Sequence, residues 1–305
     1  MDIFDKKIIQ MLNTNCRTTY QDLGSNLGVS ANAVKKRVQK LFDGGVILGF
    51  RVLPSLAMMN ANLVFALVQC DGSEDSLELM SQIGNTPVFH HVSKIVSTKG
   101  GTYYAIGWYV GLEQLSDVGQ HIRGLDGVER VEIHNLLWEK GNSLELKKLH
   151  LRVLKQLRKD PRTASQEVAR NAGISTRRAR RAIAELVESG AFLFRTRWNM
   201  STGEQTQFLV RIHYEESEVS AQDVVDWLSK EFTMEFWEPY VSASEPVVFA
   251  NFVTDTLRDA ERVSESVGEA SFVKSTSTYV SYSNAKFRRQ GDIWLEKILE
   301  KISPM

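Results

Sequence analysis

The sequence predicts an α+β fold in which one pair of domains is written twice. Residues 4–49 align with residues 149–194 at a constant offset of 145 and without a gap, and ten of the 46 paired positions are identical. Chance would give roughly three identities, so an internal duplication is the simpler explanation. The order of helical and strand-like periodicity is repeated as well. Together these observations predict two copies of a winged helix-turn-helix domain, each followed by a βαββαβ domain of the ferredoxin-like type.

The expected boundaries divide the chain into five segments. The helix-turn-helix domains are expected at residues 1–53 and 144–197, and the ferredoxin-like domains at residues 54–140 and 198–283. A C-terminal helix is expected within residues 284–305.

The first copy of the repeat is predicted to hold three short helices. A first helix has apolar residues at helical spacing, namely Phe4, Ile8, Ile9 and Leu12. The segment Thr19-Tyr20-Gln21-Asp22 has the form of an N-terminal cap, so a second helix begins there and ends at Gly28. Ser30 can cap the third helix, whose inward face is Val34, Val38 and Leu41. This order is that of a helix-turn-helix, whose last helix enters the major groove of DNA.

The outward face of the third helix is polar and basic in both copies. Its residues are Asn32, Lys35, Lys36, Arg37 and Lys40 in the first copy, and Arg177, Arg178, Arg180 and Arg181 in the second. Such side chains suit contacts to phosphate oxygens and base edges. An isolated Lys/Arg cluster is usually only a solvated surface, but two clusters at equivalent positions of a repeated helix-turn-helix favour DNA contacts.

Charge is unevenly distributed along the chain. The total is neutral, with 37 basic and 37 acidic residues. Residues 1–53 hold 8 Lys/Arg and 4 Asp/Glu (net +4), and residues 147–197 hold 14 and 4 (net +10), so the other 201 residues sum to −14. Basic modules beside acidic bodies are typical of nucleic-acid binding, and the second copy is expected to bind phosphate more strongly.

The third helix of each copy, called the reading helix below, differs between the copies at its outward positions. Asn32 aligns with Arg177, and Ala33 aligns with Arg178. Asparagine suits adenine, and arginine suits guanine. One chain is therefore expected to recognise two unlike half-sites.

Other bulk features narrow the class of protein. The sequence has no run of eighteen apolar residues, and its start reads as a charged helix rather than a signal peptide. Cys16 and Cys70 have neither metal-site spacing nor the pattern of a disulfide framework. We expect a soluble cytoplasmic protein without a membrane partner, a metal or a cofactor.

The two remaining segments repeat one order of elements. The first is expected as strand Leu63–Cys70, helix Ser73–Ile83 capped by Ser73 with Leu77 inward, strands Val88–Ser97 and Thr102–Val110, helix Leu112–Ile122 and strand Val128–Trp138. The second is expected as strand Gln207–Tyr214, helix Ala221–Phe232, strands Met234–Ser242 and Val247–Val253, helix Leu257–Val267 and strand Ala270–Tyr282. This order places two helices on one face of a four-stranded antiparallel sheet. A final helix is expected over Phe287–Ile302.

With these elements in this order, the chain resembles the leucine-responsive/asparagine (Lrp/AsnC) family of transcription regulators. The matching residues are Asp5-Lys6-Lys7-Ile8-Ile9-x-x-Leu12, Arg17-x-Thr19, Leu23, Gly28-Val29-Ser30, Val34-x-x-Arg37-Val38-x-x-Leu41 and Gly45-Val46-Ile47. The second copy departs from the pattern, with Ala164 at the position of Thr19 and Ala182 at that of Arg37. The chain is thus similar to a tandem, single-chain form of the family.

The resemblance implies a sequence-specific DNA-binding regulator whose partner is double-stranded DNA. It also implies an amino acid or similar effector near the loop between the middle strands, here Gly100, Gly101, Thr102 and Tyr103. Many members carry an aspartate where this chain has Tyr103, and a plain hairpin turn is the alternative interpretation. The ferredoxin-like domains of the family pair sheet to sheet, either within one chain or between two. We expect a homodimer with four helix-turn-helix units, to which an apolar stripe on the terminal helix adds a surface: Leu295, Ile298, Leu299 and Ile302.

No catalytic function is expected, because the histidines are scattered and no hydrolase, metalloprotease or Walker pattern occurs. Two alternatives stay open. Some siroheme-type tetrapyrrole decarboxylases share the fold of the resembled family, and Arg130, His134 or His90 are the candidates for that role. The other alternative is an interaction scaffold that does not bind DNA.

Overall fold

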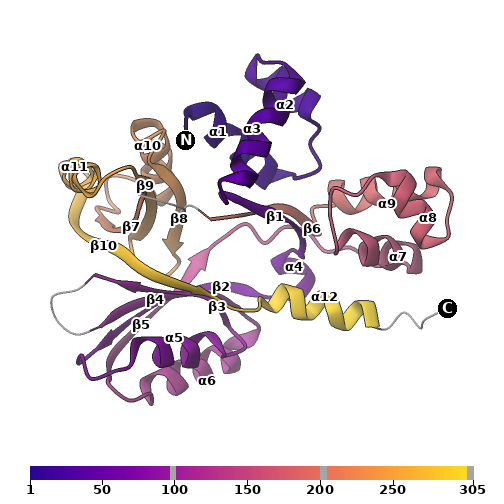
Figure 1. The fold of residues 1–305 in the computed structure, drawn as a ribbon. Helices are drawn as coiled ribbons and strands as arrows, with labels where there is room; N and C mark the ends of the chain where they lie inside the picture. The colour runs from indigo at the N-terminus through magenta and orange to yellow at the C-terminus, as the bar shows by residue number, and fades with distance from the viewer. Residues whose placement is uncertain (97–100, 200–204, 301–305) are drawn as a thin grey trace. The chain divides into compact units, whose positions relative to one another are not determined.

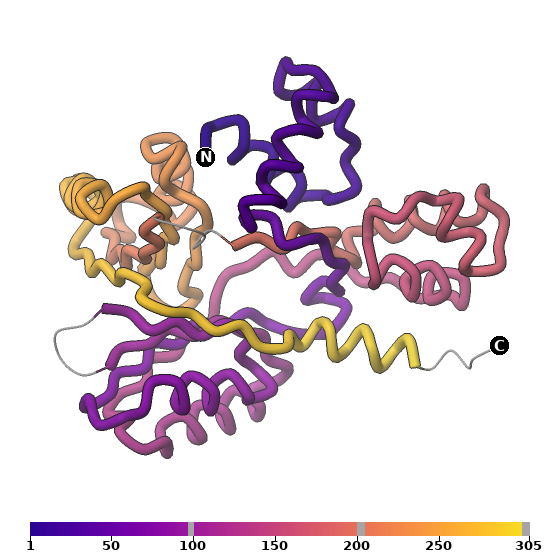
Figure 2. Tube along the Cα trace, in the orientation of Figure 1, coloured from indigo at the N-terminus to yellow at the C-terminus, as the bar shows by residue number. Residues whose placement is uncertain are grey.

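The computed structural model describes residues 1–96, 101–199 and 205–300, and the chain divides into two compact units (Figures 1 and 2). The first unit comprises Met1–Asn60, Lys140–Thr202 and Gly291–Met305, and the second comprises Ala61–Glu139 and Gly203–Gln290. Each unit therefore combines segments from both halves of the chain. The two helix-turn-helix copies form one unit, and the two βαββαβ bodies form the other.

The first helix-turn-helix copy has the three predicted helices. Its elements are α1 (Ile3–Thr14), α2 (Tyr20–Leu27), α3 (Ala31–Asp43), strand β1 (Ile47–Pro54) and the short helix α4 (Leu56–Met59). The cap residues act as the sequence predicts: Thr19 Oγ1 accepts a hydrogen bond from Asp22 N, and Ser30 Oγ accepts one from Ala33 N. Gly28 ends α2 with a φ of 69°, a left-handed conformation that favours glycine.

The second copy repeats this arrangement. Its elements are α7 (Lys148–Leu157), α8 (Ser165–Ala172), α9 (Thr176–Glu188) and strand β6 (Phe192–Trp198). Ser175 caps α9 as Ser30 caps α3, because its hydroxyl accepts a hydrogen bond from Arg178 N. Ala164, the residue in place of Thr19, gives α8 no side-chain cap.

Strands β1 and β6 join the two copies in one antiparallel ribbon. Phe50 lies opposite Thr196, and Arg51 lies opposite Arg195. The repeat relates position 50 to position 195 and position 51 to position 196. It therefore converts the pair Phe50–Thr196 into the pair Arg51–Arg195. The register is therefore that of a pseudo-twofold axis through the ribbon.

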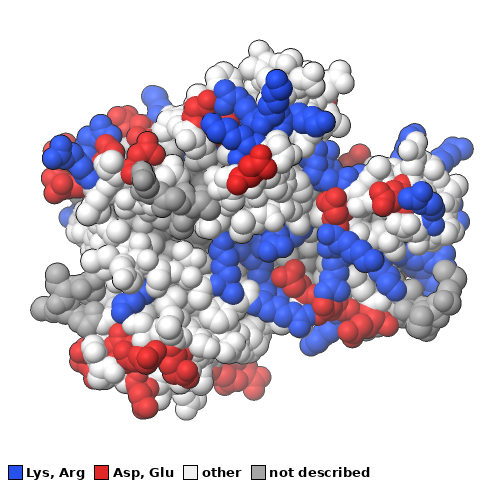
Figure 3. Space-filling model, in the orientation of Figure 1, with Lys and Arg blue, Asp and Glu red and all other residues white. Residues whose placement is uncertain are grey.

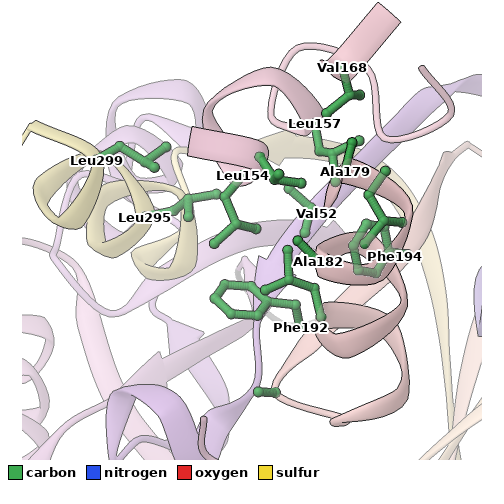
Figure 4. Close-up of a cluster of buried hydrophobic side chains, with 14 of the residues drawn as sticks. Val52, Leu154, Leu157, Val168, Ala179, Ala182, Phe192, Phe194, Leu295 and Leu299 are labelled. Atoms are coloured by element: carbon green, nitrogen blue, oxygen red, sulfur yellow. The ribbon is translucent and has the colours of Figure 1, made fainter. Parts of the chain in front are cut away.

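The C-terminal helix α12 (Gln290–Glu300) closes the second copy rather than leaving an apolar face for assembly. Leu295 and Leu299 are 1% and 7% exposed and share a hydrophobic cluster with Leu154 and Leu157 of α7 (Figure 4). Trp294 and Ile298 are partly buried against the same cluster, whereas Ile302 lies outside the described residues.

In the second unit, both bodies follow the predicted βαββαβ order. The first is made of β2 (Asn62–Cys70), α5 (Ser76–Gly84), β3 (Phe89–Ile95), β4 (Thr102–Tyr109), α6 (Gly111–Arg123) and β5 (Val128–Leu137). The second is made of β7 (Thr206–Tyr214), α10 (Ala221–Glu231), β8 (Phe236–Ser242), β9 (Val247–Thr254), α11 (Leu257–Gly268) and β10 (Val273–Lys286). The α+β fold is thus confirmed.

Two predicted helix starts were wrong: α12 begins at Gln290 rather than at Phe287, and α5 begins at Ser76 rather than at Ser73. Ser73 does not cap α5, because its hydroxyl donates to Asp71 Oδ1. Asp75 is the cap, and its carboxylate accepts hydrogen bonds from the N–H groups of Leu77 and Glu78. The shift turns Leu77 outward, where it is 80% exposed, and Leu79 is buried instead.

The strands of both bodies form one closed barrel in the order β10-β3-β4-β2-β5-β8-β9-β7. Within each body, alternate residues of the strands pack against its own two helices, as Val64, Ala66 and Val68 do in the first and Val210 and Ile212 do in the second. The bodies join at two seams: β10 pairs with β3, and β5 pairs with β8. These seams are equivalent under the repeat, since β5 corresponds to β10 and β3 to β8.

The strand faces that do not meet the helices bury aromatic and charged residues from both bodies. The rings of Phe65 and Phe249 stack with centroids 4.2 Å apart, and the ring of Tyr240 lies 6.0 Å from that of Phe65. Arg211 Nη1 lies 2.8 Å from Glu132 Oε2, with both side chains mostly buried. The sheet pairing that the family resemblance implies therefore takes place inside one chain.

Cys16 and Cys70 are buried free thiols. Among the helices in the described ranges, none has both the length and the apolar character needed to cross a bilayer.

Candidate nucleic-acid interface

Helix α3 separates a buried face from a polar one. Val34, Val38 and Leu41 are buried against the rest of the module. Four of the five predicted contact residues are exposed on the other side: Asn32, Lys35, Lys36 and Lys40. The helix therefore presents one asparagine and three lysines to solvent.

Helix α9 has the same division and a stronger charge. Ala179, Ala182, Ile183 and Leu186 are buried. All four predicted arginines are exposed: Arg177, Arg178, Arg180 and Arg181. In the space-filling view, Lys and Arg gather over the helix-turn-helix segments, whereas Asp and Glu gather over the body that contains α5 and α6 (Figure 3).

Arg37 differs from the other predicted contact residues, because it is turned toward α1. Its Nη1 lies 2.7 Å from Asp2 Oδ2 and 2.9 Å from Asp5 Oδ1. Its guanidinium also lies over the Phe4 ring, 5.4 Å from the centroid. The two carboxylates raise the pKa of Arg37. The aligned residue, Ala182, is fully buried, so this position is at the edge of the inward face in both copies.

In the second copy, a different network holds the start of α7 against α9. His150 is 2% exposed, and its Nε2 lies 2.8 Å from Glu185 Oε2. The other oxygen of Glu185 accepts a hydrogen bond from Arg181 Nε at 2.9 Å. His150 and Arg181 hold the pKa of Glu185 below its ordinary value. The ion pair with Glu185 thus orients the Arg181 side chain along α9, although that side chain is 83% exposed.

Main-chain and arginine contacts hold the two copies together beyond the β1–β6 ribbon. Cys16 N donates to Phe194 O at 2.8 Å, and Arg195 Nη1 donates to Asn13 O at 2.8 Å. Arg17 and Arg162 each donate to carbonyl oxygens of the opposite copy. The sequence shows the two arginines as identical residues of the repeat, and Arg17 also as part of the family pattern, but neither signal predicts that they lie together.

Part of the predicted effector loop lines a pocket of about 480 Å³ between the first βαββαβ body and strand β10 of the second. Its lining residues are Gly72, Glu74, Ser76, Lys94, Ile95, Val96, Gly101 and Tyr282. Thr102 and Tyr103 follow Gly101 at the start of β4 and are buried, and Gly100 lies outside the described residues.

Polar groups surround this pocket. The Tyr103 hydroxyl donates to Glu74 Oε1 at 2.8 Å and lies 2.9 Å from Ser76 Oγ. Burial raises the pKa of Tyr103. Lys94 Nζ donates to Ser76 Oγ at 2.5 Å. Glu74 Oε2 is buried and makes no hydrogen bond in the described residues. A cation, a carboxylate oxygen and a hydroxyl therefore meet in one small cavity.

The residues considered for tetrapyrrole chemistry lie on β3 and β5. Arg130 Nη2 lies 3.0 Å from Glu132 Oε1, and its side chain is 66% exposed. His134 is buried, its Nδ1 lies 3.2 Å from Ser242 Oγ, and burial lowers its pKa. His90 packs edge-on against Trp108. Over the described part of the chain, no group of His, Cys, Asp and Glu side chains is arranged to hold a metal ion.

Comparison with known proteins gives two domain matches. The AsnC-type helix-turn-helix domain matches residues 1–41, and a winged helix-turn-helix DNA-binding domain matches residues 146–191. The two matches fall on the two copies of the repeat.

Among curated relatives, an uncharacterized HTH-type transcriptional regulator of Pyrococcus furiosus is 27% identical over 136 residues, which is 42% of this chain and 89% of the relative. The HTH-type transcriptional regulator LrpA of Pyrococcus horikoshii is 28% identical over 134 residues, 43% of this chain and 92% of the relative. Each relative is therefore matched along most of its length by less than half of this chain.

Among solved structures, the siroheme decarboxylase NirDL superposes with a TM-score of 0.56 at 13% identity, covering 99% of this chain and 100% of that one. At this identity the likeness concerns the fold alone.

Proposed function

We propose that this chain is a transcription regulator of the Lrp/AsnC helix-turn-helix type. It binds double-stranded DNA through two unlike reading helices, α3 and α9. The observation that carries the proposal is the pair of exposed basic helix faces at equivalent positions of a duplicated helix-turn-helix. The net charges of +4 and +10 on the two basic segments support it, since phosphate contacts supply most of the affinity for DNA.

The reading helices are expected to divide recognition between them. Asn32 near the start of α3 suits a bidentate contact to adenine, whereas Arg177 at the aligned position of α9 suits guanine. We leave Arg37 out of the proposed contacts, because its guanidinium is occupied by Asp2 and Asp5. Footprinting with Asn32→Ala and Arg177→Ala tests this division: protection should be lost at one element per variant, and uniform weakening would contradict it.

Salt-dependent binding tests DNA recognition itself. The variants are Arg177, Arg180 and Arg181 changed together to Ala, and Lys35, Lys36 and Lys40 changed together to Ala. Each phosphate contact contributes roughly 0.9 to the slope of log affinity against log salt, so three lost contacts reduce the slope by about 2.7. The arginine variant should lose more affinity than the lysine variant.

A matched control changes Lys230, Arg258 and Arg262, exposed basic residues of α10 and α11, to Ala. Slopes and affinities equal to those of the control would reject the assignment, and indifference of the native chain to DNA at every salt concentration would favour a scaffold.

The pocket beside Gly101 suits an amino acid or a similar zwitterion as effector. Lys94 is placed to attract a carboxylate, and the buried Glu74 Oε2 lacks the donor that an ammonium group would supply. Titration calorimetry with the common amino acids tests this, with Glu74→Gln as the disabling variant and Glu78→Gln on the exposed face of α5 as the control. Identical binding, or none, for all three proteins would reject an effector at this pocket.

The predicted homodimer has to use surfaces outside the sheets, because the two sheets already pair within one chain. Light scattering at micromolar concentration tests it, and the mass of a single chain would leave one chain as the DNA-binding unit.

Tetrapyrrole decarboxylation is the second candidate, favoured by the likeness in fold to NirDL over the whole chain. An absorption spectrum after incubation with siroheme discriminates between the two functions. A shifted spectrum together with the mass loss of CO2 from the extracted tetrapyrrole would support the enzyme, and an unchanged spectrum and mass would count against it.

A further inference from the structure

We infer that Arg17 and Arg162 lock the two helix-turn-helix copies into one rigid reader and thereby set the separation of the DNA half-sites that the chain accepts. The inference rests on the proposed DNA binding for its consequence, although the lock itself is a feature of the protein. It assigns a positioning role to two residues that do not lie on the reading helices.

The contacts of the two arginines are reciprocal. Arg17 Nη1 donates to the carbonyl oxygens of Pro161 and, at 3.1 Å, Thr163. Arg162 Nη1 donates to the carbonyl oxygens of Cys16 and, at 3.2 Å, Thr18. These residues are related by the repeat offset, since positions 16, 17 and 18 correspond to 161, 162 and 163. Each arginine thus binds the residues that flank its own counterpart.

The surroundings of the lock are closely packed. The Arg162 guanidinium lies 4.9 Å from the centroid of the Tyr20 ring and 5.2 Å from that of Phe50. Burial lowers the pKa of Arg17. Cys16 is fully buried and belongs to the hydrophobic cluster of the second copy. The turn between α1 and α2 therefore inserts directly into the other module.

Main-chain acceptors make this contact a positional constraint. A carbonyl of a tight turn cannot change rotamer as a carboxylate side chain can, so the arginines fix one turn against the other. Each turn leads directly into α2 and then α3, or into α8 and then α9. A rotation of one reading helix relative to the other therefore has to break both arginine contacts as well as the pairing of β1 with β6.

Lysine is the informative replacement at both positions. Arginine presents several donors in a planar fork, whereas lysine carries one compact ammonium on a flexible stem. The double variant Arg17→Lys, Arg162→Lys keeps the charge of the module but loses the fork. Arg258→Lys on α11 is the matched control, because Arg258 is exposed and lies in the other unit.

The first readout is the dependence of affinity on half-site spacing. A duplex recovered by selection from a random pool is lengthened at its centre by about 5 or about 10 base pairs, roughly half a turn or a full turn of DNA. The native chain and the control should lose affinity about tenfold at half a turn, which is about 1.4 kcal/mol. The affinity of the double variant should fall less than about threefold when the duplex is lengthened by half a turn, while its affinity for a duplex with one half-site is unchanged. The same spacing profile in all three proteins would overturn the inference.

The second readout needs no DNA. The rate at which a thiol reagent labels Cys16, followed by mass spectrometry, reports opening between the copies, and Cys70, buried in the other unit, is an internal reference. The double variant should label Cys16 about tenfold faster, equivalent to about 1.4 kcal/mol, at an unchanged Cys70 rate. Equal Cys16 rates would overturn the lock. If the native chain binds no duplex, the proposed function fails, and the labelling experiment still judges the lock alone.

Discussion

Replacing Leu295 by alanine tests whether α12 is an integral part of the second helix-turn-helix. Leu295 is 1% exposed and shares its hydrophobic cluster with Leu154 and Leu157 (Figure 4). Truncating a buried leucine usually costs about 3–5 kcal/mol, the sum of lost burial and of the cavity left behind. Because Trp294 and Ile298 are only partly buried and can settle into the gap, we expect the lower end, about 3 kcal/mol.

Urea unfolding combined with hydrogen exchange measures this effect and locates it. Leu295→Ala should lower the free energy of unfolding by about 3 kcal/mol, and exchange should accelerate in α7 but not in β2, which belongs to the other unit. Lys297→Ala, at an exposed position of the same helix, should change stability by less than about 0.5 kcal/mol. A loss for Leu295→Ala as small as that of the control would show that α12 does not stabilise the module, and it would refute the assignment of these leucines to its core.

Three further predictions concern individual side chains. Burial, together with Lys286 and Arg289, lowers the pKa of His91 to about 3, so the ring is neutral in the folded chain, whereas in the unfolded chain it is protonated below about pH 6.5. The stability that this difference contributes is fully present above pH 6.5 and is lost as the pH falls toward about 3. In urea unfolding, His91→Gln should therefore lose about 2 kcal/mol less stability than the native chain between pH 7 and pH 5, and an equal loss in both proteins would contradict the prediction. A Cβ at Gly101 would lie 1.7 Å from Glu74 Oε1 and 2.8 Å from Tyr103 Cε2, so Gly101→Ala should cost about 1–3 kcal/mol by thermal unfolding. At Gly124 a Cβ would lie 3.5 Å from His121 O, an ordinary van der Waals contact, so Gly124→Ala should cost less than about 1 kcal/mol. Arg37→Ala should lower the free energy of unfolding by up to about 1 kcal/mol with little effect on the salt dependence of DNA binding. Lys36→Ala should leave stability nearly unchanged and reduce the salt dependence. Equal salt slopes for the two variants would place Arg37 in the DNA interface.

Local elements were predictable where a short sequence signal has one structural outcome. Thr19 and Ser30 act as caps because a hydroxyl at the start of a helix finds an unpaired N–H three residues later. The apolar spacing of α3 likewise identified the residues that turn inward. At α5 two residues, Ser73 and Asp75, could cap the first N–H groups of the helix. Asp75 caps them, because the Ser73 hydroxyl donates to Asp71 instead. Sequence periodicity does not report such a competition.

Contacts between segments far apart in sequence were not predictable. The continuous apolar run along β2 indicates that both faces are buried, but it does not identify the body that covers the second face. The pairing of β5 with β8 joins residues more than 100 positions apart, and the ladder of β1 with β6 joins residues about 145 apart. Arg37 shows the same limit at shorter range: its spacing fits a DNA contact, but Asp2 and Asp5 lie within reach once α1 folds against α3.

Duplication within one chain permits a division of labour that a symmetric dimer does not have. In a homodimer each substitution appears twice, whereas here the two halves have diverged at aligned positions. Glu132, which pairs with Arg211 between the sheets, has Ser277 as its counterpart, and Tyr103 beside the pocket has Val248. The second body thus lacks the tyrosine hydroxyl that orders Glu74, so a single chain should bind one effector rather than two. Calorimetry of the native chain gives the stoichiometry directly, and two equivalent sites would contradict this reasoning.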